Sequence, residues 1–253
     1  MSSRQQTPSG ARRFTEREVG AERSAFLAQL VAASGRARRD PSGKKMGVES
    51  HNPGGEKALY MSTPPGEYYT QERWQNWLDR IREEEGDPED EDSARLLLNL
   101  QDDTAIAVAK IVTDFQDGEL EGETALGELE DVEEIVLAEV DIADEEKAIL
   151  LDGVQRSLMC VIYAGQEYVA GGPAEEGTIE EYVHAAADAE AEDDLDAALG
   201  YCVQAGTRII DGDELGMELA EDLEFGLVAE WVNGLDSLQT AMADPEVVEE
   251  DEE

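Results

Sequence analysis

The chain is 253 residues long and carries 62 Asp and Glu residues against 19 Lys and Arg residues, a formal net charge of −43 at pH 7. Phosphate contacts need a stripe of basic residues, so this balance argues against a nucleic-acid-binding protein. The two cysteines, Cys160 and Cys202, form no CxxC pair, which favours free thiols in a reducing cytoplasm over a disulfide framework. A single Cys160–Cys202 bridge is the alternative.

The charge is divided unevenly along the chain. Residues 1–60 hold eleven Lys and Arg residues against six acidic ones, whereas residues 61–253 hold eight against fifty-six. A body this acidic would repel itself in dilute buffer, but at about 1 M salt the Debye length is only ~3 Å and most of the repulsion is screened. The sequence therefore predicts a cytoplasmic protein adapted to high salt, and an acidity set by the solvent is no evidence of a basic partner.

Residues 1–60 do not share the acidity of the rest and show no lasting periodicity. Two interpretations stay open: a disordered basic extension, or translated upstream sequence that is not native to a protein starting at Met61. An export signal at Arg12-Arg13-Phe14 is not expected, because charged residues interrupt the gap before the apolar patch Ala25–Ala33.

Helical signals follow one another after residue 61. Thr70 is predicted to cap a first helix that ends before residue 86, and Tyr69 and Trp74 have the spacing of a hydrophobic staple. Further helices are predicted over residues 92–115 and 124–140 from their apolar stripes.

The centre of the fold is predicted at Leu158–Gln166, a run of nine residues without a charge. A helix needs about 20 residues to span a bilayer, so this run belongs to a buried core and indicates no membrane segment. Asp144 as N-cap and Gly171-Gly172-Pro173 as stop signal place the run in a helix near residues 145–170.

Three more helices are expected after residue 171. Thr178 and Glu181 form a capping box at the start of the first, and the second covers about residues 194–210. The last is predicted over residues 213–242, where leucines four apart drift around the helix and so form no simple coiled-coil seam. A bend near Gly226 or Gly234 would let this helix wrap the bundle.

The fold class predicted from these elements is all-α. No residues alternate between apolar and polar for long enough to require a strand. We expect a bundle of six to seven helices around the central helix, within an acidic domain over residues 61–243. The tail over residues 244–253 is predicted to be disordered because seven of its ten residues are acidic.

Three stretches, YYTQERWQNWLDRI, EDSARLLLNLQDDTAIAVAKIV and SLMCVIYAGQEYVAGG, resemble a family of haloarchaeal proteins of unknown function. The resemblance covers roughly residues 61–242. It implies a salt-adapted protein with its native start at Met61, since family members resemble the body and not the first 60 residues. It implies no activity, cofactor or catalytic residue.

Glu181 and His184 are the one metal-like pair, because a Glu-x-x-His spacing puts both side chains on one helical face, as in di-iron bundles. One chain supplies only half of such a site, so a homodimer would have to complete it. The alternative is a surface or packed histidine, since a glutamate near any histidine is expected by chance in so acidic a chain.

No other motif indicates chemistry. There is no nucleophile elbow of the G-x-S-x-G type, no phosphate-binding G-x-x-x-x-G-K-[ST] and no G-x-G-x-x-G. Both cysteines fall in apolar helical stretches and are expected to be core residues. We therefore predict no catalytic residue and no cofactor.

The first predicted helix combines aromatic and basic residues, the types that dominate interface hot spots. Either this helix docks onto its own bundle, with Arg73 stacked on Trp77, or it presents a surface to a protein partner. That surface would consist of Arg73, Trp74, Trp77 and Arg80.

The favoured function is a non-catalytic interaction or adaptor protein with an unidentified protein partner, no nucleic acid and no membrane. The alternative is a metal-binding bundle or metal-dependent enzyme that uses Glu181 and His184 across a homodimer.

Overall fold

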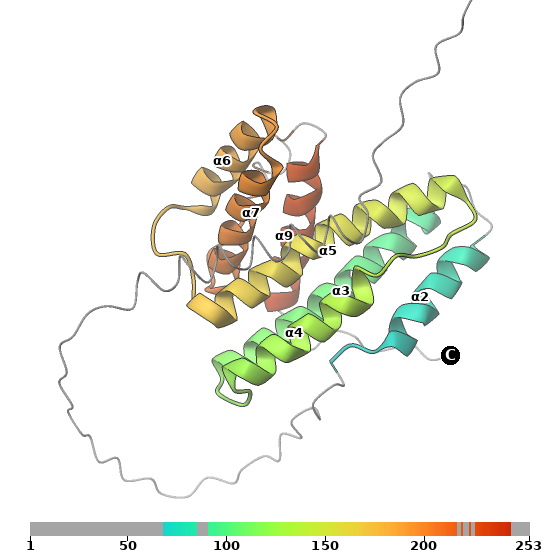
Figure 1. Ribbon diagram of the computed structural model, residues 1–253, viewed down its shortest axis with the longest axis horizontal. Helices are drawn as coiled ribbons and strands as arrows, with labels where there is room; N and C mark the ends of the chain where they lie inside the picture. The colour runs from blue at the N-terminus through green and yellow to red at the C-terminus, as the bar shows by residue number, and fades with distance from the viewer. Residues whose placement is uncertain (1–67, 85–90, 217–218, 220–222, 224–225, 244–253) are drawn as a thin grey trace, which may run out of the picture. The chain divides into compact units, whose positions relative to one another are not determined.

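Seven helices form the described part of the chain in the computed structural model, which covers residues 68–84, 91–216, 219, 223 and 226–243 (Figure 1). No strand occurs within these residues, so the all-α prediction is confirmed. The helices are α2 (Gln71–Glu83), α3 (Glu91–Gln116), α4 (Gly122–Val136), α5 (Glu145–Gly171), α6 (Ile179–Ala191), α7 (Leu195–Ile210) and α9 (Leu227–Ala243).

The chain divides into two units, Met1–Ser50 and His51–Glu253, and every described residue belongs to the second. The predictions for residues 1–60 and for the tail over 244–253 lie outside the described residues.

Helix α5 is the central helix, as predicted. Asp144 caps its N-terminus, where Oδ1 accepts the backbone N–H groups of Glu146 at 3.0 Å and Lys147 at 3.2 Å. The helix ends at Gly172, whose φ of +83° is a left-handed conformation that favours glycine. Nearly all of Leu158–Gln166 is buried, because α3, α4, α7 and α9 all pack against α5.

By length and composition, the whole of α5 could also cross a membrane. The prediction considered only the uncharged run, whereas the helix has 27 residues. The core helix of a bundle meets the same test, and half of the apolar window of α5 is buried inside this fold. The length of α5 therefore does not by itself indicate a membrane protein.

Helices α3 and α5 run side by side in the same direction (Figure 1). Ser157 Oγ of α5 donates to Gln101 Oε1 of α3 at 2.7 Å, and further along Gln116 Nε2 of α3 donates to the Tyr168 hydroxyl at 2.9 Å. Between these two pairs Gly165 packs against Val108, where a Cβ would lie 3.1 Å from the valine side chain. The two long helices therefore share one register over most of their length.

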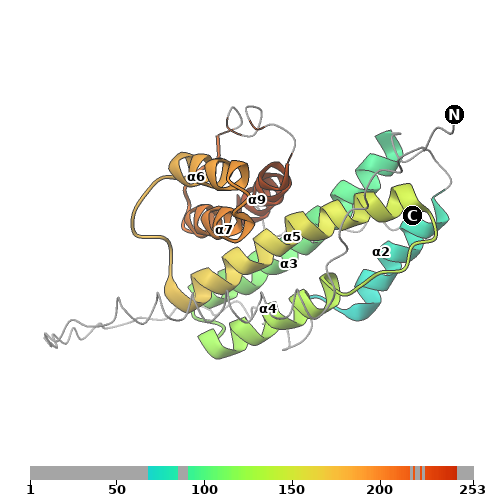
Figure 2. The ribbon, with the colours of Figure 1, turned by 45° about the horizontal axis from the view of Figure 1, so that its top comes forward.

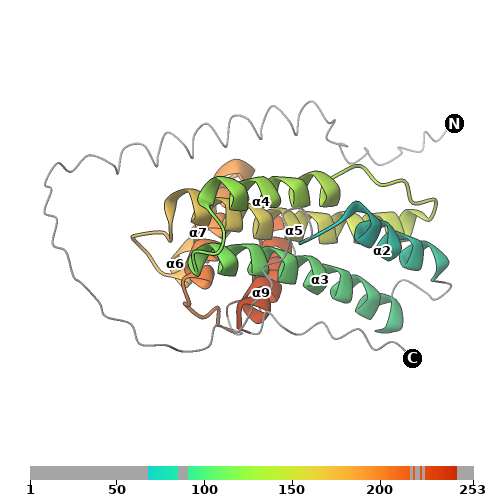
Figure 3. The same ribbon diagram turned by 90° about the horizontal axis from the view of Figure 1, so that it is seen from below.

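Helices α7 and α9 approach α5 closely at glycines. A Cβ on Gly206 would lie 2.5 Å from the Cβ of Ala164, and one on Gly234 would overlap the backbone oxygen of Ser157. Gly234, predicted as a bend site, thus lies within α9 and permits close contact. Helix α9 crosses α3 and α5 at a steep angle instead of running along them (Figures 2 and 3).

Helix α2 begins at the predicted cap, since Thr70 Oγ1 accepts the backbone N–H of Arg73 at 3.1 Å. Tyr69 and Trp74, the predicted staple, are both buried. At the other end the Lys147 ammonium of α5 donates to the backbone oxygens of Ile81, at 2.8 Å, and Glu84. The Lys147 ammonium thus caps the C-terminal carbonyls of α2 and joins α2 to α5.

The last helix is shorter than predicted. Residues 213–216 are not helical, and α9 begins at Leu227 instead of continuing from residue 213. The physical reason is a cap from another helix: Glu190 Oε1 of α6 accepts the backbone N–H of Leu227 at 2.6 Å. The helix predicted over residues 124–140 likewise ends earlier, at Val136.

Candidate functional site

The aromatic residues of α2 that suggested a partner surface lie against their own bundle. Trp74 is only 1% exposed and packs in the core with Leu78 and Ile81. Trp77 is partly exposed, but its indole Nε1 donates to the buried carboxylate of Asp103 on α3 at 2.8 Å. Within the described residues, both tryptophans of α2 therefore make contacts inside their own bundle.

The two arginines of this predicted surface also pair within the fold. Arg73 donates from Nε to Asp103 Oδ2 at 2.9 Å and from its second terminal nitrogen to Oδ1, a bidentate pair. Its guanidinium lies 5.5 Å from the centre of the Tyr69 ring, whereas Arg80 lies 4.4 Å from that of Trp77. The expected stacking of Arg73 on Trp77 is wrong, because Asp103 holds Arg73 on the side of Tyr69.

Glu181 and His184 lie on the exposed side of α6. The Glu181 carboxylate accepts the backbone N–H of Thr178 at 2.9 Å, and Thr178 Oγ1 accepts the N–H of Glu181 at 3.2 Å. This is the predicted capping box, so the carboxylate already has a local role. Within the described ranges, no three His, Cys, Asp or Glu side chains come together to hold a metal ion.

Cys160 and Cys202 are free thiols in the core. Burial raises the pKa of Cys160 well above its usual value, and the nearby Cys202 raises it further. Burial likewise raises the pKa of Cys202 to about 12, with a smaller contribution from Glu190. Both groups are therefore neutral and shielded at neutral pH, unlike the exposed thiolates that act as nucleophiles.

An open pocket of 380 Å³ lies beside the N-terminus of α2. A helix N-terminus attracts anions, but the carboxylates of Asp131 and Glu134 line the same pocket and repel them. The two features oppose each other, so this pocket indicates no ligand class.

Two buried carboxylates are fixed by neighbouring donors. Besides Asp103, Glu133 on α4 is only 3% exposed and accepts a hydrogen bond from Gln166 Nε2 of α5 at 2.8 Å. The Tyr163 hydroxyl lies 3.4 Å from the other carboxylate oxygen of Glu133. Sequence reasoning could not distinguish these two among so many acidic residues, because only the packing shows which are buried.

Exposed apolar side chains form the feature that sequence reasoning missed. Among the described residues, the large apolar side chains that remain exposed are Leu98 (50%), Ile149 (61%), Leu150 (39%) and Tyr201 (39%). The first three lie near the N-terminal ends of the parallel helices α3 and α5. We call Leu98, Ile149 and Leu150 the α3–α5 apolar face.

Leu98 and Ile149 continue the surface that α9 covers. Leu98 lies one turn before Asp102, whose Oδ1 accepts a hydrogen bond from Ser237 Oγ of α9 at 2.8 Å. Ile149 lies one turn before Gly153, where a Cβ would be 3.9 Å from Glu230 of α9. Residues four apart share one helical face, so the α3–α5 apolar face begins where α9 ends its coverage.

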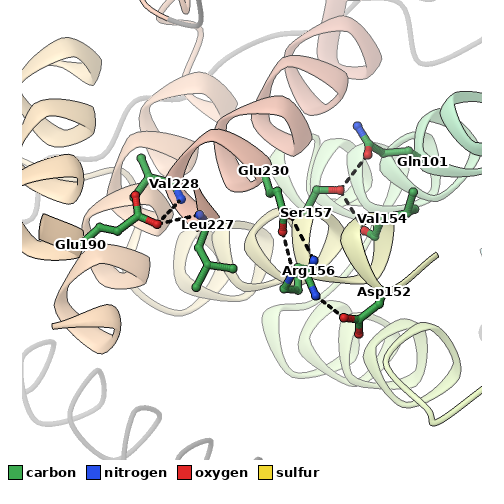
Figure 4. Close-up of polar contacts among 9 residues, drawn as sticks. All are labelled: Gln101, Asp152, Val154, Arg156, Ser157, Glu190, Leu227, Val228 and Glu230. Carbon is green, nitrogen blue, oxygen red and sulfur yellow. Dashed lines mark hydrogen bonds and ion pairs between the residues drawn. The ribbon is translucent and has the colours of Figure 1, made fainter. Parts of the chain in front are cut away.

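A polar seam fixes α9 at this position (Figure 4). Arg156 of α5 donates to both carboxylate oxygens of Glu230, from Nε at 2.5 Å and from a terminal nitrogen at 3.1 Å, and also pairs with Asp152. Gln101 Nε2 donates to Asn233 Oδ1 at 2.8 Å and lies 2.9 Å from Ser237 Oγ. These bonds join α3, α5 and α9 at the edge of the apolar face.

The sequence does carry a signal for the apolar face. Leu96, Leu97 and Leu98 are consecutive, as are Ile149, Leu150 and Leu151. Successive helical residues are about 100° apart, so three in a row cannot all face one core. Leu151 is buried while Ile149 and Leu150 are not, as this geometry requires.

The chain matches a protein family described as an uncharacterized protein conserved in archaea (DUF2150) over residues 67–251. The match contains every described helix and reaches into the acidic tail, beyond the end at residue 242 expected from the resemblance. No curated protein and no solved structure matches the chain. With most of its length inside the match, this all-α chain belongs to that archaeal family.

Proposed function

We propose that this protein is a non-catalytic interaction module that binds another protein through the α3–α5 apolar face. The observation that carries the proposal is that Leu98, Ile149 and Leu150, each at least 39% exposed, lie near the N-terminal ends of two parallel helices, where Leu98 and Ile149 each lie one turn before a residue next to α9. Exposed large apolar side chains at one end of a helix pair favour a binding surface, because covering them removes apolar area from water.

The acidity of the chain strengthens the argument from these exposed apolar side chains. Residues 61–253 hold fifty-six acidic residues, and the solvated faces of the helices are mostly carboxylate. On a chain this acidic, exposed large apolar side chains such as these three are unusual and favour a role in binding. The same acidity supports the proposal of a haloarchaeal, salt-adapted protein of the cytoplasm, because concentrated salt screens the repulsion between its carboxylates.

The proposal is tested by affinity capture with the full chain in molar KCl from cells that express it. Ile149→Gln removes an exposed apolar side chain without changing the charge. Tyr201→Gln makes the same kind of change on α7, at a residue outside the face. We expect Ile149→Gln to lose a protein that the parent chain and Tyr201→Gln both retain. Equal recovery by all three chains would contradict the proposal.

A further inference from the structure

We propose that the ligand of the α3–α5 apolar face is an amphipathic helix of a partner protein, apolar on one side and flanked by Lys and Arg, that lies beside α9. This inference rests on the proposed function and specifies the chemistry of the partner. Two observations carry it: the face extends an existing helix-binding surface, and carboxylates border it.

The first observation is continuity with the surface that binds α9. Helix α9 crosses α3 and α5 with Gly234 against the Ser157 backbone and with polar contacts to Gln101 and Asp102. Leu98 and Ile149 lie one turn further toward the N-terminal ends of the same two helices. A surface that accepts one crossing helix therefore continues over a further turn of each helix, where Leu98 and Ile149 stay exposed.

The second observation is the charge around the face. Glu145 and Glu146 in the first turn of α5 are exposed, and the Asp152 side chain one turn further is 65% exposed. On α5 the cation within this stretch, Lys147, is engaged with backbone oxygens of α2. The α3 side of the face is less acidic, because the exposed Arg95 lies one turn before Leu98. Arg156 is engaged with Glu230 and Asp152.

The overall acidity of the chain says nothing about a partner, but the position of these carboxylates does. A helix that covers Ile149 and Leu150 would bring its flanking side chains next to Glu145 and Glu146, whereas Asp152 is already paired with Arg156. At contact distance, opposite charges attract even where salt screens longer-range forces, whereas acidic flanks would be repelled. Lys and Arg are therefore the expected flanking residues.

A second copy of this chain fits the face less well. Its apolar face could meet the first, but the bordering carboxylates of both copies would then be brought together. Like charges brought together across an interface disfavour the contact. We therefore treat self-association as an outcome of the experiment and not as the proposal.

The experiment measures binding of a fluorescently labelled synthetic helix of leucine and lysine, with all leucines on one face, to the full chain in molar KCl. A second peptide replaces every lysine by glutamate, and a third has the same composition in a scrambled order. We expect the leucine–lysine helix to bind and the other two peptides to bind at least about tenfold more weakly.

The matched variants locate the site. Leu98→Gln and Ile149→Gln should each weaken the leucine–lysine helix by about tenfold or more, because each removes one apolar contact. Tyr201→Gln should leave binding unchanged. All three positions are exposed, so the circular dichroism of each variant should match that of the parent chain. Equal weakening at Tyr201 would mean non-specific attraction and would overturn the proposal.

Light scattering separates this proposal from the proposed function. If the chain is a dimer that Ile149→Gln dissociates, and the leucine–lysine helix does not bind, the helix proposal fails while the interaction function stands. If no peptide binds, the chain is a monomer and Ile149→Gln retains every captured protein, both proposals fail.

Discussion

Residue types suggest that α2 is exposed and that the N-terminal ends of α3 and α5 are buried. The exposure of their side chains shows the reverse. Helix α2 carries tryptophans and arginines, the residues of interface hot spots, yet Trp74 is buried and Asp103 binds both Arg73 and Trp77. The ends of α3 and α5 carry ordinary leucines and an isoleucine, yet these remain exposed. Residue type is thus a weaker guide to which side chains stay exposed than the number of apolar positions that one helical face can bury.

The largest expected effect tests whether both regions belong to one salt-dependent fold. Removing KCl exposes the repulsion among fifty-six acidic residues after residue 60, which only eight basic residues offset. We expect the helical circular dichroism to be lost as KCl falls well below ~1 M, where the Debye length exceeds ~3 Å. An unchanged spectrum in dilute buffer would contradict the charge argument.

The next prediction tests whether the aromatic residues of α2 belong to the core. Trp74→Ala should lower the free energy of unfolding by about 3–5 kcal/mol, because it removes a large side chain from a fully packed site. Denaturant unfolding at fixed KCl measures this loss. Ile149→Ala, at the exposed face, is the control and should stay within ~0.5 kcal/mol of the parent chain. A Trp74→Ala variant as stable as the parent chain would contradict the core role of Trp74 and would favour α2 as a binding surface.

Two leucines offer the same chemical change in the two environments. Leu158 in the centre of α5 is fully buried, whereas Leu98 is half exposed. Leu158→Ala should cost about 2–5 kcal/mol of stability, and Leu98→Ala should cost far less. Unfolding midpoints measured side by side decide this, and equal losses would mean that the apolar face is covered within the chain.

The smallest effect concerns Glu167, which lies on α5 beyond the buried run. Burial raises the pKa of Glu167, although a hydrogen bond from Gln204 lowers it in part. A carboxyl whose pKa is raised by folding destabilises the fold wherever it is ionised, and this cost disappears below its unfolded pKa of about 4.3.

Glu167→Gln keeps an acceptor for Gln204. It should therefore raise stability at pH 7, and the gain should shrink as the pH falls toward ~4. The difference between the unfolding midpoints of variant and parent chain across this range is the measurement. A variant that is less stable at pH 7 would show that folding lowers the pKa of Glu167 instead.

Local signals in the sequence predicted much of the fold. Thr70, Asp144 and Thr178 each cap the helix that they were predicted to cap, because a cap depends on residues two or three positions away. The uncharged run predicted the central helix for a similar reason, since a chain so rich in carboxylates leaves few stretches without charge. The all-α class followed from the same helical periodicity.

Long-range contacts explain where the sequence was insufficient. The start of α9 depends on Glu190, which lies 37 positions before Leu227. The position of Arg73 depends on Asp103, which lies 30 positions further along the chain. Neither pairing can be chosen from the sequence when acidic residues are so numerous. The apolar face was predictable in part, because the triplets Leu96–Leu98 and Ile149–Leu151 exceed what one helical face can bury.

The central claim, that the ends of α3 and α5 form the binding surface and α2 does not, is tested most directly by photo-crosslinking. A photoreactive residue would replace Leu98, Ile149, Arg80 or Tyr201 in turn, in cells kept at molar KCl. We predict one adduct of the same mass from positions 98 and 149 and none from positions 80 and 201. An adduct from position 80 alone, or no adduct at positions 98 and 149, would contradict the account.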